Sequence, residues 1–237
     1  MLLRSASTGG FEVYDISNNK ITNADAAFLG NVGLNWQVMG FGNFSSIPGE
    51  TDMILRNSNT GGLEVYDIAN NAITNAAFIG TVGLEWQFSG VGNFSSVRGE
   101  SDLLLRNVNT GALQVYDITD NRITRTASLG AVGLDWDFAG VAPVSAAGAS
   151  DLVLRNSRTG AFQVYNIADN QVTGSASLGS VGLDWERSGG IGGEPCPSAT
   201  RPGDVVVLAR CRAFPRGHRA RGARCSSRAD ARGAGRR

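Results

Sequence analysis

The sequence predicts an all-β protein of four tandem repeats of about 50 residues. Each repeat has four short strands, arranged like the blades of a partial or four-bladed β-propeller, and a disordered tail follows. Three observations lead to this fold class. Arg, Tyr and Trp residues recur at a fixed interval, and glycine is frequent, at 32 residues. No segment keeps a helical period of apolar residues over about 11 positions.

Three landmarks define the repeat: the arginine of a Leu-Arg pair, the tyrosine of a Val-Tyr segment and the tryptophan of a Gly-Leu-x-Trp segment. They are Arg4, Arg56, Arg106 and Arg155; Tyr14, Tyr66, Tyr116 and Tyr165; and Trp36, Trp86, Trp136 and Trp185. Arg to Tyr is 10 residues in every copy, whereas Tyr to Trp is 22 in the first copy and 20 in the others. Constant spacings mark strands and length changes mark loops, so a loop insertion is expected between Thr22 and Phe28.

The second copy shows the expected order of elements. Strands are predicted at 52–56, 63–68, 72–79 and 86–91. The polar segment 57–62 ends in two glycines that can adopt positive φ, which predicts a hairpin turn. Ala69-Asn70-Asn71 predicts the second turn.

The predicted strands carry apolar residues on both faces, as in Met53-Ile54-Leu55. A lone sheet would leave one of these faces in water, so we expect the units to stack on one another. Four strands per unit of this length are typical of a propeller blade. A linear β-solenoid or a stack of β-sandwiches is the alternative.

These patterns divide the chain into repeats at 1–51, 52–101, 102–150 and 151–189, and a tail at 190–237. We expect the chain to be a fragment of a larger exported protein. Its first residues begin inside a strand, and the fourth repeat loses its last strand to the tail.

The segment before each Leu-Arg pair supplies a family likeness. In the first copy it reads Gly40-Phe41-Gly42-Asn43-Phe44-Ser45-Ser46-Ile47-Pro48-Gly49-Glu50-Thr51-Asp52. With the Thr-Gly, Val-Tyr-Asp-Ile and Gly-Leu-x-Trp elements, it resembles the FG-GAP or VCBS repeat of bacterial surface and secreted proteins, which also builds the propeller of integrin α chains. The resemblance covers residues 1–189.

The resemblance implies a non-catalytic module outside the cell or on its surface, often with a Ca²⁺ in each such loop. Its implied function is adhesion, or binding of an extracellular protein or carbohydrate ligand. A structural spacer or a truncated gene remnant without its own partner is the alternative.

The implied calcium loops are degenerate. Ca²⁺ needs several hard oxygen ligands, usually carboxylates at alternate positions. The weak candidates are Asn43, Ser45 and Asp52 in one loop and Asn93, Ser95 and Asp102 in the next, while Pro48 and Arg98 replace the middle Asp. One carboxylate, or two with Glu50 or Glu100, holds the ion poorly. We therefore expect no cofactor, and expect these side chains to bond local backbone groups.

The landmark residues have structural and functional interpretations. The arginines are expected to pair with a nearby acid such as Asp52 or Asp67, with an ionic ring as the alternative. The tyrosines and tryptophans are expected to fill the core between blades, with sugar-stacking platforms as the alternative.

The repeats are not expected to form an enzyme. They contain no His or Cys, no Gly-x-Ser-x-Gly and no phosphate-binding loop, and so lack the usual bases, nucleophiles and metal ligands. Glu64 and Asp67 would suit a glycosidase carboxylate pair. In the third repeat Gln114 replaces the Glu and stands beside Asp117. In the fourth repeat Gln163 and Asn166 replace both carboxylates.

The net charge changes sign at the boundary between the repeats and the tail. Residues 1–189 carry a net charge of −8, and residues 190–237 carry +8 with all three cysteines and the single histidine. An Arg-, Gly- and Ala-rich segment is what a GC-rich gene yields when read out of frame, so we interpret the tail as frameshifted. A nucleic-acid-binding arm is the alternative, and the absence of Lys from the tail counts against it.

Sequence patterns alone do not indicate a compartment. No apolar run reaches the length of a membrane helix, and no secretory signal is visible at the N-terminus. The spacing of the tail cysteines matches no zinc site. A location outside the cell therefore rests on the family resemblance.

Overall fold

The computed structural model describes residues 1–22 and 26–185. The described residues form strands, turns and bends without a helix. No helix in this part of the chain is therefore long and apolar enough to cross a membrane. The predicted all-β class and repeated four-stranded units are confirmed. The predicted tail at 190–237 lies outside the described residues.

The described strands form four larger antiparallel sheets in sequence order and one separate two-stranded hairpin. The first sheet contains β1 (Leu2–Arg4), β2 (Gly10–Val13) and β5 (Ala27–Asn31), beside a small hairpin of β3 (Ile16–Ser17) and β4 (Lys20–Ile21). The second contains β6 (Trp36–Gly42), β7 (Asp52–Asn57), β8 (Gly62–Ala69) and β9 (Ala72–Thr81). The third contains β10 (Trp86–Gly92), β11 (Asp102–Asn107), β12 (Ala112–Thr119) and β13 (Arg122–Ala131). The fourth contains β14 (Trp136–Ala142), β15 (Asp151–Asn156), β16 (Ala161–Ala168) and β17 (Gln171–Ser180).

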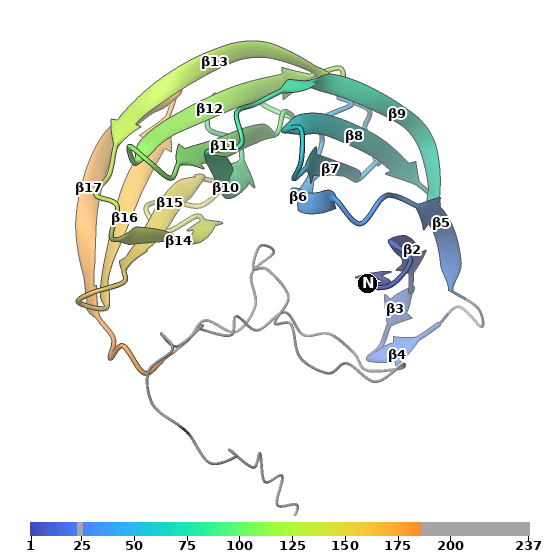
Figure 1. The fold of residues 1–237 in the computed structure, drawn as a ribbon, viewed down its shortest axis with the longest axis horizontal. Coiled ribbons are helices and arrows are strands. Elements are labelled where there is room, and N and C mark those ends of the chain that lie inside the picture. Colours follow the sequence, from blue (N-terminus) through green and yellow to red (C-terminus); the bar gives the residue numbers. More distant parts are fainter. Residues whose placement is uncertain (23–25, 186–237) are drawn as a thin grey trace, which may run out of the picture.

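The sheets follow one another around an open arc (Figure 1). Strands β6, β10 and β14 lie on the inner side of the arc, and β9, β13 and β17 form its outer rim. Neighbouring sheets touch along their outer strands, and the second, third and fourth sheets also touch along their inner strands. The described residues resemble part of a propeller and do not close into a ring.

The sheets are offset from the sequence repeats. Each tryptophan strand was predicted as the fourth strand of its own repeat, but it pairs with the first strand of the next. Trp86 opens β10, which lies beside β11, and Trp136 opens β14, which lies beside β15. A loop therefore carries the chain from the outer edge of one sheet to the inner edge of its neighbour.

The hydrophobic core lies between the sheets. All six residues of β7 are buried. Met53 and Leu55 join a cluster with Phe11 of the first sheet, whereas Ile54 joins a cluster with Leu103 of the third. Burying one such side chain stabilises the fold by about 1.5–3 kcal/mol. The expectation of apolar residues on both faces of a packed sheet is confirmed.

The inner strands approach one another at glycines. The register between β6 and β7 shifts between Val38 and Gly40. A Cβ on Gly40 would lie 2.7 Å from Cγ2 of Val91 on β10. This glycine of the Gly-Phe-Gly motif therefore allows neighbouring sheets to converge at the inner side of the arc.

The outer hairpins use two-residue turns. Asn70 and Asn71 join β8 to β9 with φ values of 50° and 59°, and Asp120 and Asn121 join β12 to β13 with 50° and 56°. Positive φ at both positions is the type I′ geometry that suits the twist of a hairpin. Asn and Asp are the non-glycine residues that tolerate it best.

Candidate functional site

The loops of the arc emerge on two opposite faces. We call one of them the clasp face, after the contacts between Asn and Asp side chains of neighbouring sheets that lie on it. It carries the loops from β6 to β7, β10 to β11 and β14 to β15, together with the two-residue turns of the outer hairpins. The leucine face carries the loops that lead from each outer strand to the next inner strand, together with the turns β7–β8, β11–β12 and β15–β16.

The weak calcium candidates lie in the clasp-face loops, where backbone groups use them. Asp52 accepts hydrogen bonds from the backbone N–H groups of Phe44 and Ser45, both at 2.6 Å. Asp102 accepts one from the N–H of Ser95 at 2.7 Å. Burial raises the pKa of Asp102. Each buried carboxylate therefore closes its own loop.

The remaining candidates bond to nearby loops and strands. The side chain of Asn43 donates to the Gly99 carbonyl at 2.8 Å, and its backbone N–H donates to Oγ of Ser101 at 2.9 Å. The side chain of Asn93 donates to the Val97 carbonyl at 2.8 Å, and Ser95 Oγ bonds to Asn93 Oδ1.

The donor set of these loops does not fit Ca²⁺. Oδ1 of Asp52 and of Asp102 is buried without a hydrogen-bond partner, and in the first loop Glu50 lies beside Ser45, so each loop offers few carboxylate oxygens to an ion. Calcium takes six to eight oxygen ligands. No group of three or more His, Cys, Asp or Glu side chains gathers around a metal-sized site in the described part of the chain.

The landmark arginines bind backbone carbonyls instead of the predicted acids. Nη2 of Arg56 donates to the Gly83 carbonyl at 3.0 Å, and Nη2 of Arg106 donates to the Gly133 carbonyl at 3.0 Å. Arg4 and Arg155 make the same contact with Gly33 and Gly182. Burial lowers the pKa of Arg56 and of Arg106. Each arginine thus fixes the loop that leads to the next sheet.

Three of the four tyrosine landmarks, Tyr66, Tyr116 and Tyr165, are half-buried against the core. Tyr66 packs on the cluster between the first and second sheets, and Tyr116 on the next cluster. The Tyr66 hydroxyl also donates to Oε2 of Glu64 at 2.7 Å. Burial and this hydrogen bond raise the pKa of Tyr66 to about 12.

Three of the four tryptophans also pack on the core. Trp36, Trp86 and Trp136 are partly buried, each against a different cluster between sheets. Trp185 differs, because 67% of its surface is exposed. The expectation that every landmark tryptophan fills the core is therefore wrong for Trp185.

A second recurring contact was not predicted from the sequence. The side-chain amide of Asn121, in the turn of the third sheet, donates to both carboxylate oxygens of Asp67 in the second sheet, at 2.9 and 2.7 Å. Asn170 and Asp117 repeat the contact between the third and fourth sheets, and Asn71 and Asp15 repeat it between the first and second. We call each contact a clasp.

The clasp also holds the neighbouring loop. The backbone N–H of Asn121 donates to the Phe44 carbonyl at 2.8 Å, and the N–H of Asp120 donates to Oγ of Ser46 at 3.2 Å. The Phe44 side chain is fully buried between the second and third sheets. Phe94 has the same place between the third and fourth, where its carbonyl accepts from the N–H of Asn170 at 2.8 Å.

The leucine face carries one exposed leucine per sheet. Each is the leucine of a Gly-Leu-x-Trp segment, in the loop that leaves an outer strand. The exposed fractions are 57% for Leu34, 54% for Leu84, 58% for Leu134 and 50% for Leu183. These leucines were predicted only as part of the repeat motif, although their recurrence in a loop was the available signal of a surface role.

Acidic side chains accompany three of these leucines. Glu85, Asp135 and Asp184 follow Leu84, Leu134 and Leu183 directly. A hydrogen bond of 2.7 Å from Asn156 lowers the pKa of Asp135, so this side chain is held as an anion. The leucine face therefore combines exposed aliphatic side chains with acidic groups, of which Glu85 and Asp135 interact with the landmark arginines Arg56 and Arg106.

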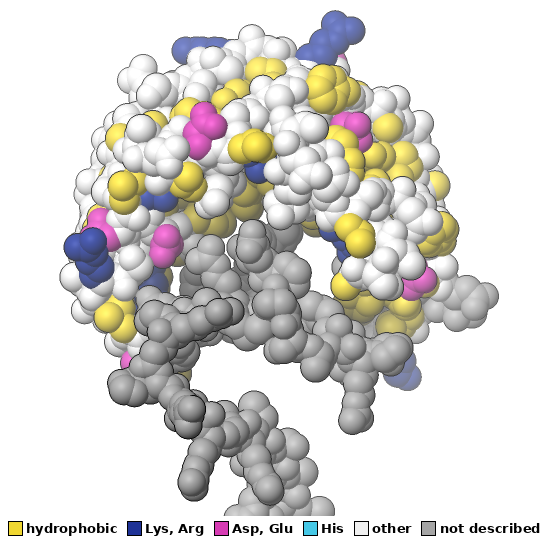
Figure 2. All heavy atoms as spheres, in the orientation of Figure 1, with side chains coloured by type: hydrophobic (Ala, Val, Ile, Leu, Met, Phe, Trp, Pro, Cys, Tyr) yellow, Lys and Arg dark blue, Asp and Glu magenta, His cyan; other side chains and the backbone are white. Residues whose placement is uncertain are grey.

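The space-filling view shows how sparse the surface groups are. In Figure 2, hydrophobic side chains form separate patches on the visible face of the arc, with single acidic and basic side chains between them. A ligand in contact with several such patches would have to extend along the arc.

No protein-family model matches the chain, and no curated protein matches its sequence. The likeness to FG-GAP or VCBS repeats therefore rests on the repeated motifs alone.

Proposed function

We propose that this chain is a non-catalytic module of an exported bacterial protein, and that it binds another protein through the leucine face. The observation that carries the proposal is the exposed leucine that recurs once per sheet along the arc. Because they recur in one structural position along the arc, these leucines differ from the scattered single apolar residues that are normal on a protein surface.

A protein ligand suits this face better than a carbohydrate. Binding of sugars by stacking needs exposed aromatic rings, but Trp36, Trp86 and Trp136 are packed against the core. Of the four tryptophans, Trp185 alone is mostly exposed. The recurring exposed groups are aliphatic, and aliphatic side chains pack well against the apolar side chains of a protein.

The acids beside the leucines favour a basic ligand. Glu85, Asp135 and Asp184 place an acidic side chain beside three of the four exposed leucines. Complementary charge speeds association and excludes acidic competitors. We infer an extended protein segment in which aliphatic and basic residues alternate.

The carboxylates considered for catalysis have structural partners, which supports a non-catalytic role. Glu64 accepts from the Tyr66 hydroxyl, whereas Asp67 accepts from the side chains of Asn75 and Asn121. Both lie on β8, three positions apart, so they project from opposite faces of the sheet.

Peptide selection tests the proposed ligand class. A phage library of random 12-residue peptides is selected on the immobilised chain, and the selected peptides are titrated against purified variants. We expect aliphatic and basic sequences. We also expect the double variant Leu84→Ser/Leu134→Ser to bind them about tenfold more weakly or worse.

The matched control changes exposed apolar residues on the outer strands. Phe78→Ser/Leu178→Ser removes side chains that are 64% and 50% exposed, and it should leave the affinity unchanged. Equal loss in both double variants would contradict the proposal. A glycan array on which binding survives loss of the leucines would favour a carbohydrate ligand, and no ligand in either assay would favour the spacer.

A further inference from the structure

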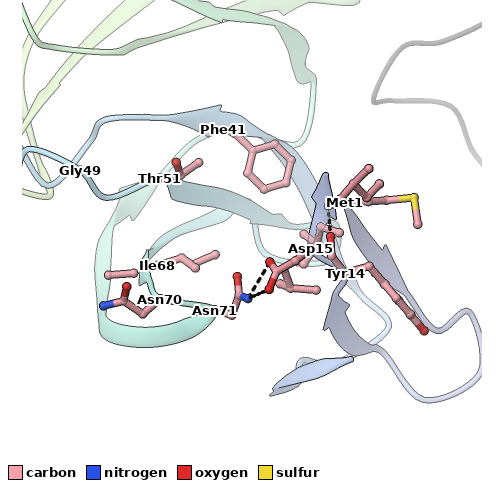
Figure 3. A pocket seen from close by; sticks show the side chains of 13 residues that line it. Met1, Tyr14, Asp15, Phe41, Gly49, Thr51, Ile68, Asn70 and Asn71 are labelled. Carbon is pink, nitrogen blue, oxygen red and sulfur yellow. Dashed lines mark hydrogen bonds between the residues drawn. The ribbon is translucent and has the colours of Figure 1, made fainter. Parts of the chain in front are cut away.

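We propose that Trp36, Glu64 and Phe78 of the second sheet form a binding site for a quaternary ammonium group. The site is distinct from the proposed function, because it uses none of the exposed leucines. It lies beside Gly62, the first residue of β8. The opposite end of β8 carries Ile68, which lines the pocket between the first and second sheets that Figure 3 shows.

The three side chains share one face of the second sheet. Glu64 on β8 lies opposite Phe78 on β9 and opposite Leu55 on β7. Side chains directly opposite each other in an antiparallel pair have Cβ atoms about 4.5–5.5 Å apart. Trp36 and Leu55 belong to the same core cluster, so Trp36 projects from the face that carries Glu64. One carboxylate and two aromatic rings are therefore gathered on this face.

A glycine brings the two rings together. A Cβ added to Gly62 would lie 3.3 Å from Cε2 of Phe78 and 3.8 Å from Cη2 of Trp36, so both rings approach the same point above the strand. The Phe78 side chain is nevertheless 64% exposed. Its ring is thus supported by the backbone on one side and open to a ligand on the other.

The hydroxyl of Tyr66 orients the carboxylate. It donates to Oε2 of Glu64 at 2.7 Å, and this bond leaves Oε1 for a ligand. A carboxylate beside an aromatic face attracts an organic cation, through its own charge and through the negative face of the ring. Residues 1–189 carry a net charge of −8, which favours the approach of a cation to this part of the chain.

The four repeats change together at the glycine, glutamate and phenylalanine of this site. The first two repeats have all three residue types, whereas the last two have alanine, glutamine and serine. The sets are Gly10, Glu12 and Phe28; Gly62, Glu64 and Phe78; Ala112, Gln114 and Ser128; and Ala161, Gln163 and Ser177. The landmark tyrosine two positions after the glutamate or glutamine is present in all four.

Packing explains only two of these three changes. A ring that covers a strand glycine supports the sheet, and alanine can replace the glycine where the ring is absent. Packing does not explain why Gln114 replaces the glutamate, since the amide oxygen of glutamine also accepts a hydrogen bond from a tyrosine hydroxyl. Loss of the negative charge together with the ring is the change expected where a cation is no longer bound.

A quaternary ammonium group suits this site better than a basic side chain. It has no N–H group, so it gives up no hydrogen bonds to water when it moves onto the rings, and its methyl groups pack against them. A lysine ammonium is compact and strongly hydrated. It would gain less at a site where the Phe78 ring remains largely in contact with water.

The probe is choline, titrated against the full isotope-labelled chain and followed by NMR. A parallel titration uses the neutral alcohol in which a carbon atom replaces the choline nitrogen, because it has the same shape without the charge. We expect choline to shift the amide signals of Gly62, Glu64 and Phe78 with a Kd on the order of millimolar. The neutral alcohol should bind about tenfold more weakly or worse.

Exchange of residues between sheets tests the location of the site. Glu64→Gln/Phe78→Ser gives the second sheet the residues of the third and should abolish the shifts. The matched control, Leu84→Ser/Leu134→Ser, should leave them unchanged. The reverse exchange in the third sheet, Ala112→Gly/Gln114→Glu/Ser128→Phe, should create a site whose own amides shift with choline.

Thermal melts verify that each variant is folded. If Phe78 only covers Gly62, Glu64→Gln/Phe78→Ser will lower the melting temperature and choline will shift no amide in the original chain, which would overturn the proposal. Equal binding of choline and the neutral alcohol would overturn it as well. Binding that survives Glu64→Gln/Phe78→Ser would have the same consequence.

Discussion

The side-chain amide of Asn170 donates to both carboxylate oxygens of Asp117, at 2.9 and 2.8 Å, across the boundary between the third and fourth sheets. Asn170 is 3% exposed and Asp117 is 5% exposed. The same contact between Asn71 and Asp15 lies at the surface. Because a buried carboxylate without its donor keeps its desolvation penalty, the two clasps should differ in their contribution to stability.

Asn170→Gly should lower the free energy of unfolding by about 1–3 kcal/mol, since it leaves Asp117 without its donor. Asn71→Gly is the matched control, because both asparagines have a φ of 59° and glycine tolerates that geometry equally well at either site. The control should cost well under about 1 kcal/mol. Urea unfolding measures both values, and equal losses would show that the buried clasp has no special role.

Trp86→Ala should lower the free energy of unfolding by about 3 kcal/mol, because it removes a large side chain from the cluster between two sheets. Trp185→Ala should have little effect, since that side chain is mostly exposed. Iodide quenching in single-tryptophan variants provides a second measurement. Trp185 should be quenched readily and the other three protected, and uniform quenching would contradict the packing described above.

Calcium should contribute little to stability. A ligand that binds only the folded protein at 100 times its Kd adds about 2.7 kcal/mol, so a real site would raise the melting temperature by several degrees. Asp52 and Asp102 are already bonded to backbone N–H groups, so we expect thermal melts in EDTA and in millimolar calcium to overlay. A rise on adding calcium that Asp102→Asn removes would prove the loops competent.

Alkaline pH should destabilise the fold through Tyr66. Its pKa is about 12 in the folded protein, against an ordinary value of 10.0, so the folded state holds this proton more tightly than the unfolded state does. The stability linked to this proton is complete below pH 10 and is lost as the pH rises towards 12. Absorbance at 295 nm should show a late-ionising phenol that Tyr66→Phe removes.

The partner of Tyr66 provides the control for this titration. Glu64→Gln should lower the pKa of Tyr66, because it removes the negative charge and leaves the burial in place. An unchanged titration in this variant would assign the raised pKa to burial alone.

Most of the strand order was predictable, because spacing and composition are properties of the chain itself. Three consecutive apolar residues, Met53, Ile54 and Leu55, required cover on both faces, and the structure supplies it from two neighbouring sheets. The sheet to which each tryptophan strand belongs was not predictable in the same way. A periodic sequence has no inherent starting point, so the repeat was divided one strand away from the sheet boundary.

The contacts between sheets were harder to predict. Asn71 was sufficiently explained as a turn residue, and its partner Asp15 lies 56 residues away. The nearly constant separations of the clasped pairs, at 56, 54 and 53 residues, were the available signal. The arginines gave no such signal, because their acceptor is a backbone carbonyl, and every residue has one.

The strands of the second, third and fourth sheets are hydrogen-bonded in the order of the sequence. Contacts of this kind form early, because each closes a short loop. Synthesis proceeds at about 5–20 residues per second, so a ribosome would release one sheet roughly every 2–10 seconds. During that interval the newest sheet has one apolar face without its neighbour. Slow translation within a repeat would therefore lengthen the time in which the nascent chain is open to aggregation.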